Sequence, residues 1–164
     1  MKIAVTGHRP DKLFGYNLAH PKYTDLKHVI FKFLNANKPD HCISGMALGV
    51  DTVFAQAVLQ YKETNTCILE CAIPCLNHSL MWNGESRAEY NRILSIADKV
   101  TMVSEKPYSP KLMQKRNEYM VDLLGEGDIL LAIYNGDLSG GTYNCIKYAK
   151  KSKAKTEIIT VSSI

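Results

Sequence analysis

The stretch Ser139-Gly140-Gly141-Thr142 has residue types suited to binding an anion. It follows an apolar run, Asp128 to Tyr134, and precedes a predicted helix that starts at Tyr143. The two glycines let the backbone approach a ligand because no Cβ atoms stand in the way. The helix start offers unpaired N–H groups and the positive end of the helix dipole. This combination favours a phosphate, although a plain strand-to-helix turn has the same residues.

Two further glycine turns follow predicted strands. They are Thr6-Gly7-His8-Arg9 and the stretch from Ser44-Gly45-Met46 to Gly49-Val50-Asp51, which runs into a helix. In an open parallel sheet, ligands bind outside the carboxyl ends of the strands, near the point where the strand order reverses. Three such turns predict one shared site for a phosphate-bearing ligand. No GxxxxGK[ST] or GxGxxG fingerprint is present, which argues against a P-loop NTPase and a classical dinucleotide dehydrogenase.

Charged and polar side chains near these turns each have a ligand-binding and a structural interpretation. Arg9 and Arg116 can fork onto phosphate oxygens or make surface salt bridges. Asp51 can hold a ribose hydroxyl or favour the dipole at its helix start. Trp82 can stack on a base or anchor the core. The predicted ligand contacts are Gly7, His8, Arg9, Ser44, Gly45, Met46, Gly49, Asp51, Trp82, Arg116, Asn117, Gly140, Gly141 and Thr142.

Apolar periodicity indicates strands that alternate with helices. Strands are predicted at Lys2–Val5, His41–Ser44, Cys67–Ile73, Lys99–Val103, Asp128–Tyr134 and Glu157–Val161. Helices are predicted from Thr24, after Asp51, over His78–Ala97, from Ser109 and after Thr142. This pattern predicts a Rossmann-like, doubly wound α/β fold, with a mostly parallel sheet and helices on both faces. We expect a single domain over residues 1–164.

Composition is that of an ordinary globular protein, with 46% hydrophobic and 22% charged residues. No apolar run approaches the ~20 residues of a membrane span, and no signal peptide is evident, so we expect a cytoplasmic protein without a membrane partner. The net charge is +4. A basic cluster near the C-terminus indicates either a solvated helix face or a nucleic-acid surface; it comprises Lys147, Lys150, Lys151, Lys153 and Lys155.

Five cysteines in a chain without an export signal are expected to be reduced. Cys67, Cys71 and Cys75 are spaced by four, which invites a metal interpretation. Two of them fall in a predicted strand, and no CxxC pair exists, so we predict no metal site. No other cofactor is predicted.

Four motifs together resemble one family. They are Thr6-Gly7-His8-Arg9-Pro10, Ser44 to Asp51, Arg116 to Asp122 and Gly140-Gly141-Thr142, in that order. Over nearly the whole chain, this is similar to the YpsA-like branch of the SLOG superfamily, the Rossmann-like group that includes the DprA and LOG proteins. The resemblance implies a nucleotide or nucleotide-derived ligand at the glycine turns. It also implies a homo-oligomer, since Rossmann-like relatives are often dimers.

Members of the superfamily differ in function, so the resemblance implies three hypotheses. The first is a sensor or sequestering module for an ADP-ribose-like or NAD-derived signalling nucleotide. The second is a nucleotide N-glycosidase, or phosphoribohydrolase, as in LOG-type relatives. The third is single-stranded DNA binding, as in DprA-type relatives.

The sequence lacks a carboxylate shortly after Thr142, and this absence favours binding over catalysis. LOG-type relatives have a glutamate shortly after the glycine–threonine motif, whereas here Thr142 is followed by Tyr143-Asn144-Cys145-Ile146. Cleavage of a glycosidic bond needs a carboxylate to stabilise the oxocarbenium-like centre or to activate water. Glu85 and Asp51 are the weak catalytic candidates. We therefore favour the binding module over the enzyme, and rank DNA binding third because the positive charge is modest.

Overall fold

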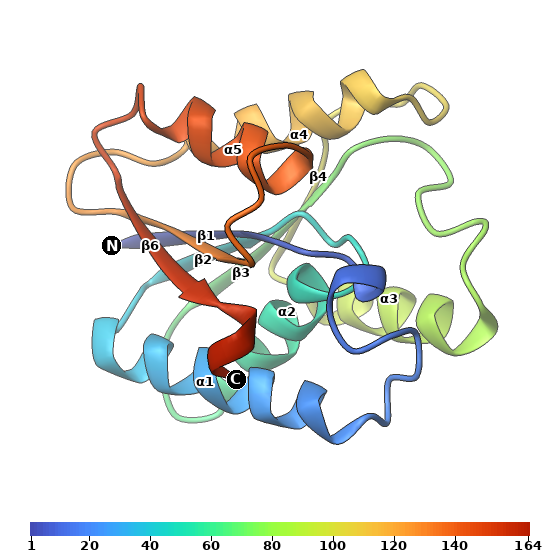
Figure 1. The fold of residues 1–164 in the computed structure, drawn as a ribbon, viewed down its shortest axis with the longest axis horizontal. Coiled ribbons are helices and arrows are strands. Elements are labelled where there is room, and N and C mark those ends of the chain that lie inside the picture. The colour runs from blue at the N-terminus through green and yellow to red at the C-terminus, as the bar shows by residue number, and fades with distance from the viewer.

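The computed structural model describes residues 1–164, and its strands alternate with helices (Figure 1). The elements are β1 (Lys2–Gly7), α1 (Pro21–Asn37), β2 (His41–Ser44), α2 (Val50–Tyr61), β3 (Ile68–Ile73), α3 (Gly84–Ile96), β4 (Lys99–Met102), α4 (Pro110–Asp122), β5 (Ile129–Tyr134), α5 (Gly141–Ala149) and β6 (Lys155–Thr160). All six strands form one parallel sheet in the order β4-β3-β2-β1-β5-β6. The predicted Rossmann-like α/β fold is confirmed.

The helices lie on both faces of this sheet. In Figure 1, α1, α2 and α3 lie below the sheet, and α4 and α5 lie above it. The first three connections therefore cross one face and the next two cross the other. The strand order consequently reverses between β1 and β5, whose carboxyl ends are neighbours: Gly7 pairs with Ile133. None of the helices combines the length and the apolar character that crossing a membrane requires.

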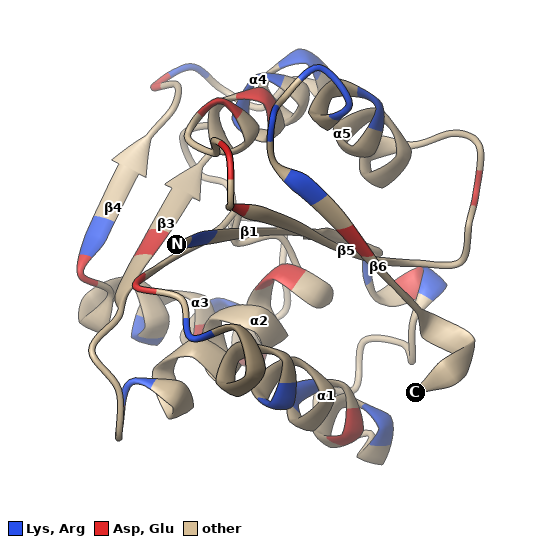
Figure 2. Ribbon diagram, turned by 90° about the vertical axis from the view of Figure 1, so that its left-hand side faces the viewer, with Lys and Arg blue, Asp and Glu red and all other residues tan.

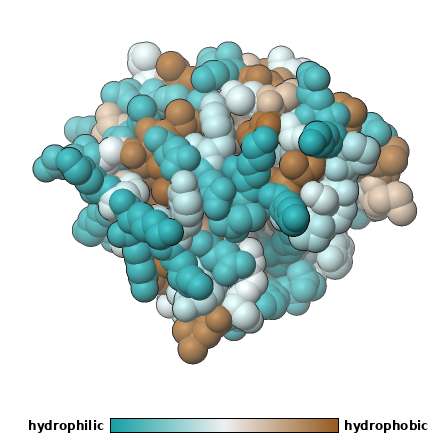
Figure 3. Space-filling model, turned by 90° about the horizontal axis from the view of Figure 1, so that it is seen from above, coloured by the Kyte–Doolittle hydropathy of each residue, from teal (hydrophilic) through white to brown (hydrophobic).

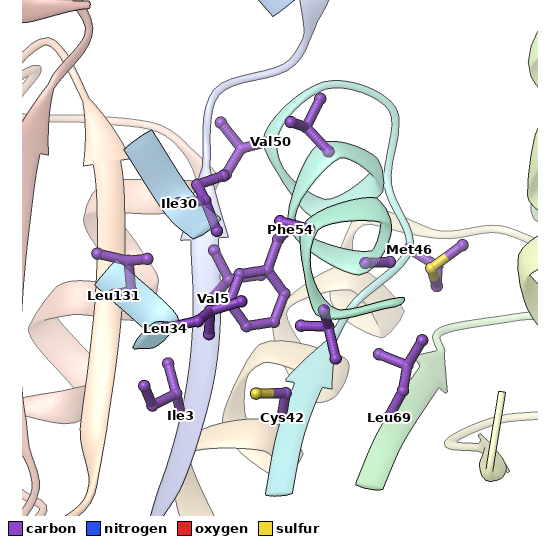
Figure 4. Close-up of a cluster of buried hydrophobic side chains, with 14 of the residues drawn as sticks. Ile3, Val5, Ile30, Leu34, Cys42, Met46, Val50, Phe54, Leu69 and Leu131 are labelled. Carbon is purple, nitrogen blue, oxygen red and sulfur yellow. The ribbon is translucent and has the colours of Figure 1, made fainter. Parts of the chain in front are cut away.

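The larger part of the core lies between the sheet, α1 and α2. Figure 4 shows Phe54 of α2 among Val5 of β1, Leu34 of α1 and their neighbours, and all three side chains are fully buried. Leu26, Ile30 and Leu34 recur at helical spacing, so α1 buries one continuous apolar stripe. This packing holds α2 against β1, which places the start of α2 beside the end of β1.

One prediction of secondary structure is wrong over several residues. Helix was expected from His78, but α3 begins only at Gly84, and the preceding segment forms turns. Asn83 has an extended backbone, with φ of −63° and ψ of 161°, which a helix cannot continue through. Asn83 then caps α3, because its side-chain oxygen accepts a hydrogen bond from Ser86 N–H at 2.8 Å. The turn segment is left to line a cavity, described below.

Candidate functional site

A cavity of about 210 Å³ opens at the switch point between β1 and β5. This is where an open parallel sheet binds its ligands. Residues of all three glycine turns and of α4 line it: Thr6, Gly7, His8, Arg9, Asp11, Lys12, Ala47, Asp51, Met113, Arg116, Asn117, Ser139, Gly140, Gly141 and Thr142. We call it the switch-point cavity. Nine of the fourteen predicted ligand contacts are thus brought together.

The turn before α5 presents its backbone to this cavity. Gly140 has φ of 94° and ψ of 176°, a conformation open essentially to glycine alone. The first hydrogen bond of α5 runs from Asn144 N–H to the Gly140 carbonyl at 3.0 Å, and no side chain caps the helix. The N–H groups of Gly141, Thr142 and Tyr143 therefore have no partner within the protein. A Cβ at Gly140 or Gly141 would meet no atom within 4 Å, so this turn has open space in front of it.

The turn after β1 joins three elements. The buried His8 accepts a hydrogen bond at Nε2 from Asn135 N–H at 3.0 Å, and its carbonyl accepts one from Val50 N–H at 3.2 Å. Burial lowers the pKa of His8, an effect opposed by the Asp137 carboxylate 3.6 Å from Nε2. His8 thus connects the end of β1 to the end of β5 through its neutral imidazole, and to the start of α2 through its carbonyl.

Two cations of this turn flank the cavity near its mouth. Arg9 is exposed and makes no salt bridge, so the predicted salt-bridge alternative does not apply to it. Lys12 Nζ lies 2.8 Å from Asp137 Oδ2, which holds the lysine beside the site. Together with Arg116, three cationic side chains line the cavity against the two carboxylates of Asp11 and Asp51. The lining therefore favours an anionic ligand.

The turn after β2 is packed against the protein rather than open. The Ser44 hydroxyl donates to the Asp51 carbonyl at 2.8 Å and accepts from Met46 N–H at 3.2 Å. A Cβ at Gly45 would lie 2.6 Å from Arg116 Cζ. A Cβ at Gly49, where φ is +90°, would lie 2.5 Å from the His8 carbonyl oxygen. Ser44, Gly45, Met46 and Gly49 line neither the switch-point cavity nor the one beside it, and their glycines allow close packing.

Arg116 of α4 is buried and holds this turn from the other face of the sheet. Its Nη1 donates to the Gly45 carbonyl, its Nε donates to Asn117 Oδ1 at 2.9 Å, and Nη1 lies 3.8 Å from Asp51 Oδ2. Burial raises the pKa of Asp51, while Arg116 and a hydrogen bond from Ala47 N–H at 3.1 Å oppose that rise. Burial likewise lowers the pKa of Arg116, and Asp51 opposes that change. Arg116 and Asp51 thus form a buried pair of opposite charges beside the cavity, and each favours the charged form of the other.

Trp82 does not line the switch-point cavity. It lines a second cavity, of about 450 Å³, that shares Arg9 and Met113 with the switch-point cavity. Of the catalytic candidates, Asp51 lines the switch-point cavity. Glu85 lies exposed in the first turn of α3 and lines neither cavity.

Several lining residues were missed by the sequence analysis. Asp11 and Lys12 lie within three residues of the predicted turn that ends at Arg9, and Ser139 belongs to the predicted turn before α5 but was not among the predicted contacts. Tyr16 and Tyr108 of the second cavity lie in loops after different strands, and no local pattern connects them. The five cysteines are free and buried, and no group of three or more acidic, histidine or cysteine side chains is placed to hold a metal ion.

A sequence model of the YspA SLOG family matches residues 3–164. The chain belongs to the YspA SLOG family. The SPbeta prophage-derived protein YoqJ of Bacillus subtilis is 34% identical over 136 residues, which are 76% of this chain and 77% of YoqJ. The UPF0398 protein BH1768 of Halalkalibacterium halodurans is 30% identical over 155 residues, which are 91% of this chain and 80% of that protein.

Solved structures support the same assignment at the level of the fold. This SLOG chain resembles DNA processing protein A from Helicobacter pylori with a TM-score of 0.62 and 17% identity, over 96% of this chain. That structure describes a single-stranded DNA binding mode of the Helicobacter protein. The SLOG chain spans 64% of the length of that neighbour. The family model confirms the predicted membership of the SLOG superfamily, and the structural likeness shows a DprA-like fold.

Proposed function

We propose that this SLOG protein binds a nucleotide or nucleotide-derived ligand, of the ADP-ribose or NAD-derived kind, as a sensor or sequestering module. The observation that carries the proposal is the start of α5, where three backbone N–H groups lack protein partners beside an open cavity. Arg9 and Lys12 add positive charge at the same cavity. Unpaired N–H groups, a helix dipole and cations together recognise phosphate.

The carboxylates near the cavity favour binding over hydrolysis. Asp51 is the buried one, and its Oδ2 already accepts from Ala47 N–H and faces Arg116. A catalytic carboxylate must reach the anomeric carbon or a water beside it. Glu85 is exposed outside both cavities, so it is poorly placed to replace the glutamate of LOG-type relatives. We therefore expect the ligand to be released unchanged.

Calorimetric titration with AMP, ADP-ribose and NAD tests this proposal. We expect at least one of these three ligands to bind. We expect Arg9→Ala to lower the affinity for that ligand about tenfold or more, because a hydrogen bond to a charged group contributes about 1.5–3 kcal/mol. Arg87→Ala, an exposed arginine that lines neither cavity, is the matched control. Mass spectrometry of denatured, freshly purified protein would identify a co-purified ligand. Absence of binding by all three probes would refute the proposal, and free base among the products would favour the N-glycosidase.

A second candidate, single-stranded DNA binding, is favoured by the surface of α4 and α5. Lys147 Nζ lies 5.4 Å from the ring centre of Tyr143, and Lys151 Nζ lies 5.9 Å from that of Tyr148. Figure 2 shows further basic segments on these helices, and Figure 3 shows that this face is largely hydrophilic. Alternating lysines and tyrosines offer charge for phosphates and rings for bases. The DNA binding described for the Helicobacter neighbour is the family precedent.

Fluorescence anisotropy with a labelled oligothymidine separates this candidate from the first. If DNA binds here, Lys147→Ala and Lys151→Ala weaken it at low salt and reduce the dependence of affinity on salt concentration. Lys32→Ala, exposed on α1 across the sheet, is the control. Absence of binding at low ionic strength would exclude the candidate. We also expect the homodimer that the resemblance implies, measurable by light scattering.

A further inference from the structure

The second cavity lies beside the switch-point cavity and is built from different loops. Its lining comes from the segments after β1, β2, β3 and β4 and from α4: Arg9, Pro10, Tyr16, Leu48, Asn77, His78, Met81, Trp82, Asn83, Tyr108 and Met113. Its volume of about 450 Å³ falls within the range of small-molecule sites. Because Arg9 and Met113 line both cavities, one ligand can span them. We call this second space the aromatic cavity.

Large apolar side chains of this cavity are left facing solvent. Tyr16 is 56% exposed, Tyr108 is 62% exposed and Met81 is 91% exposed. They come from three loops far apart in the sequence yet line one space. Three exposed apolar groups around one concavity are typical of a binding site whose ligand covers them.

Trp82 is held in a fixed orientation within this cavity. Its ring lies edge-on to His78, with ring centres 5.0 Å apart, and edge-on to Tyr90, at 5.2 Å. Tyr90 is buried in α3, so the pair anchors the indole to the protein. A rigid indole near two exposed tyrosines suits stacking on a flat aromatic ring.

Two of the neutral polar side chains that line the aromatic cavity offer different hydrogen-bonding groups. His78 Nε2 lies 3.2 Å from the Met46 carbonyl oxygen, which can only accept, so Nε2 carries the proton and Nδ1 is an acceptor. Asn83 uses its side-chain oxygen to cap α3, which leaves its Nδ2 as a donor. Arg9, at the border with the switch-point cavity, is the one charged residue among those that line the cavity. A neutral ring with donors and acceptors on its edge matches this lining, whereas a charged ligand does not.

We infer that the aromatic cavity binds the nucleobase of a ligand whose phosphate lies at the start of α5. This inference rests on the proposed function for the position of the phosphate. Trp82, Tyr16 and Tyr108 supply the stacking surface, and His78 and Asn83 face the polar edge of the base. Arg9 lies where base and phosphate portions meet.

The chain has a single tryptophan, so its fluorescence reports on the aromatic cavity alone. The experiment titrates the protein with AMP and with ribose 5-phosphate, following heat by calorimetry and Trp82 emission in parallel. We expect both to bind, AMP about tenfold or more tightly, because stacking on an aromatic side chain contributes on that scale. Only AMP should change Trp82 emission. Titrations with GMP and CMP then rank the bases by affinity.

Variants locate the effect without unfolding the protein. Tyr108→Ala, at an exposed position, should lower the affinity for AMP about tenfold and leave the affinity for ribose 5-phosphate unchanged. Ile158→Ala, at an exposed position on β6 and outside both cavities, should change neither. His78→Phe keeps a ring but removes both the Nδ1 acceptor and the hydrogen bond to the Met46 carbonyl, so it should narrow the differences in affinity between the bases.

Each unfavourable outcome points to one hypothesis. Equal affinities for AMP and ribose 5-phosphate, with unchanged Trp82 emission, would overturn the inference and leave the proposed function standing. Failure of AMP, ADP-ribose and ribose 5-phosphate to bind at all would overturn the proposed function instead. A change of oligomeric state in Tyr108→Ala would show that the exposed side chains form a protein interface, and would also overturn the inference.

Discussion

The turn between β2 and α2 and the turn before α5 have similar sequences and opposite surroundings. Both follow a strand, contain two glycines and run into a helix. In the first, added Cβ atoms would overlap Arg116 and the His8 carbonyl. In the second, they would meet nothing within 4 Å. Glycine therefore permits close packing of protein against protein in one turn and leaves room for a ligand in the other.

Hydrogen bonding divides the two turns in the same way. Ser44, Asp51 and Thr52 bond to backbone groups of the first turn, and Arg116 and His78 bond to its Gly45 and Met46 carbonyls. The second turn leaves the first N–H groups of α5 without partners. Substitutions in the packed turn should thus change stability, and those in the open turn should change binding.

The largest expected effect is that of Arg116→Ala, in α4, which removes a side chain that holds the packed turn. The substitution removes the donor to the Gly45 carbonyl and leaves Asp51 buried without its counter-charge. We expect the free energy of unfolding to fall by about 3–5 kcal/mol, measured by urea denaturation. Arg9→Ala, at an exposed arginine of the same cavity, should stay within about 0.5 kcal/mol of the wild type. Equal losses in the two variants would contradict the comparison.

Gly49→Ala should cause the next largest loss of stability. Its φ of +90° is unfavourable for alanine, and the new Cβ would lie 2.5 Å from the His8 carbonyl oxygen. The combined strain and overpacking should reduce stability by about 2–4 kcal/mol in the same denaturation experiment. Gly15→Ala offers a control, since its φ is +82° but nothing lies within 4 Å, so it reports strain alone.

Acid should weaken the packed turn through His78, which donates to its Met46 carbonyl. Burial, with Arg116 nearby, lowers the pKa of His78 to about 4. Because the unfolded chain binds the proton from about pH 6.5 downward and the folded chain only near pH 4, stability falls as the pH drops across that window, by up to roughly 3 kcal/mol. Urea denaturation of wild type and His78→Gln between pH 7 and 4.5 measures this. A variant with the same slope as the wild type would show that His78 is not responsible.

The smallest effect on stability is expected at Gly141 in the open turn. Alanine there meets no neighbour and suits the first turn of α5, so stability should rise by up to about 1 kcal/mol in thermal denaturation. Gly140→Ala should instead lose about 1–3 kcal/mol, because its φ of 94° and ψ of 176° exclude a side chain. If Gly141→Ala destabilised the protein as Gly49→Ala does, the two turns would not differ as described.

Much of the fold was predictable because its signals are local. The apolar stripe Leu26, Ile30 and Leu34 predicts α1, and the run Ile129–Tyr134 predicts a buried strand. Alternation of such elements predicts a parallel sheet with helices on both faces. The start of α3 was mispredicted because it depends on the extended backbone of Asn83 and on the cap that its side chain forms, which override a weak helical pattern.

The sequence by itself determined the elements, the sheet edge that carries the three glycine turns, and membership of the SLOG superfamily. Tertiary structure alone decided which turn is open, because a glycine's role depends on the atoms opposite its missing Cβ. Arg116, from a helix more than sixty residues further along the chain, fills the space beside Gly45, whereas nothing fills the space beside Gly141. The tertiary structure likewise brought Tyr16, Trp82 and Tyr108 from three loops to one cavity. Contacts between such distant segments leave no periodic trace in the sequence.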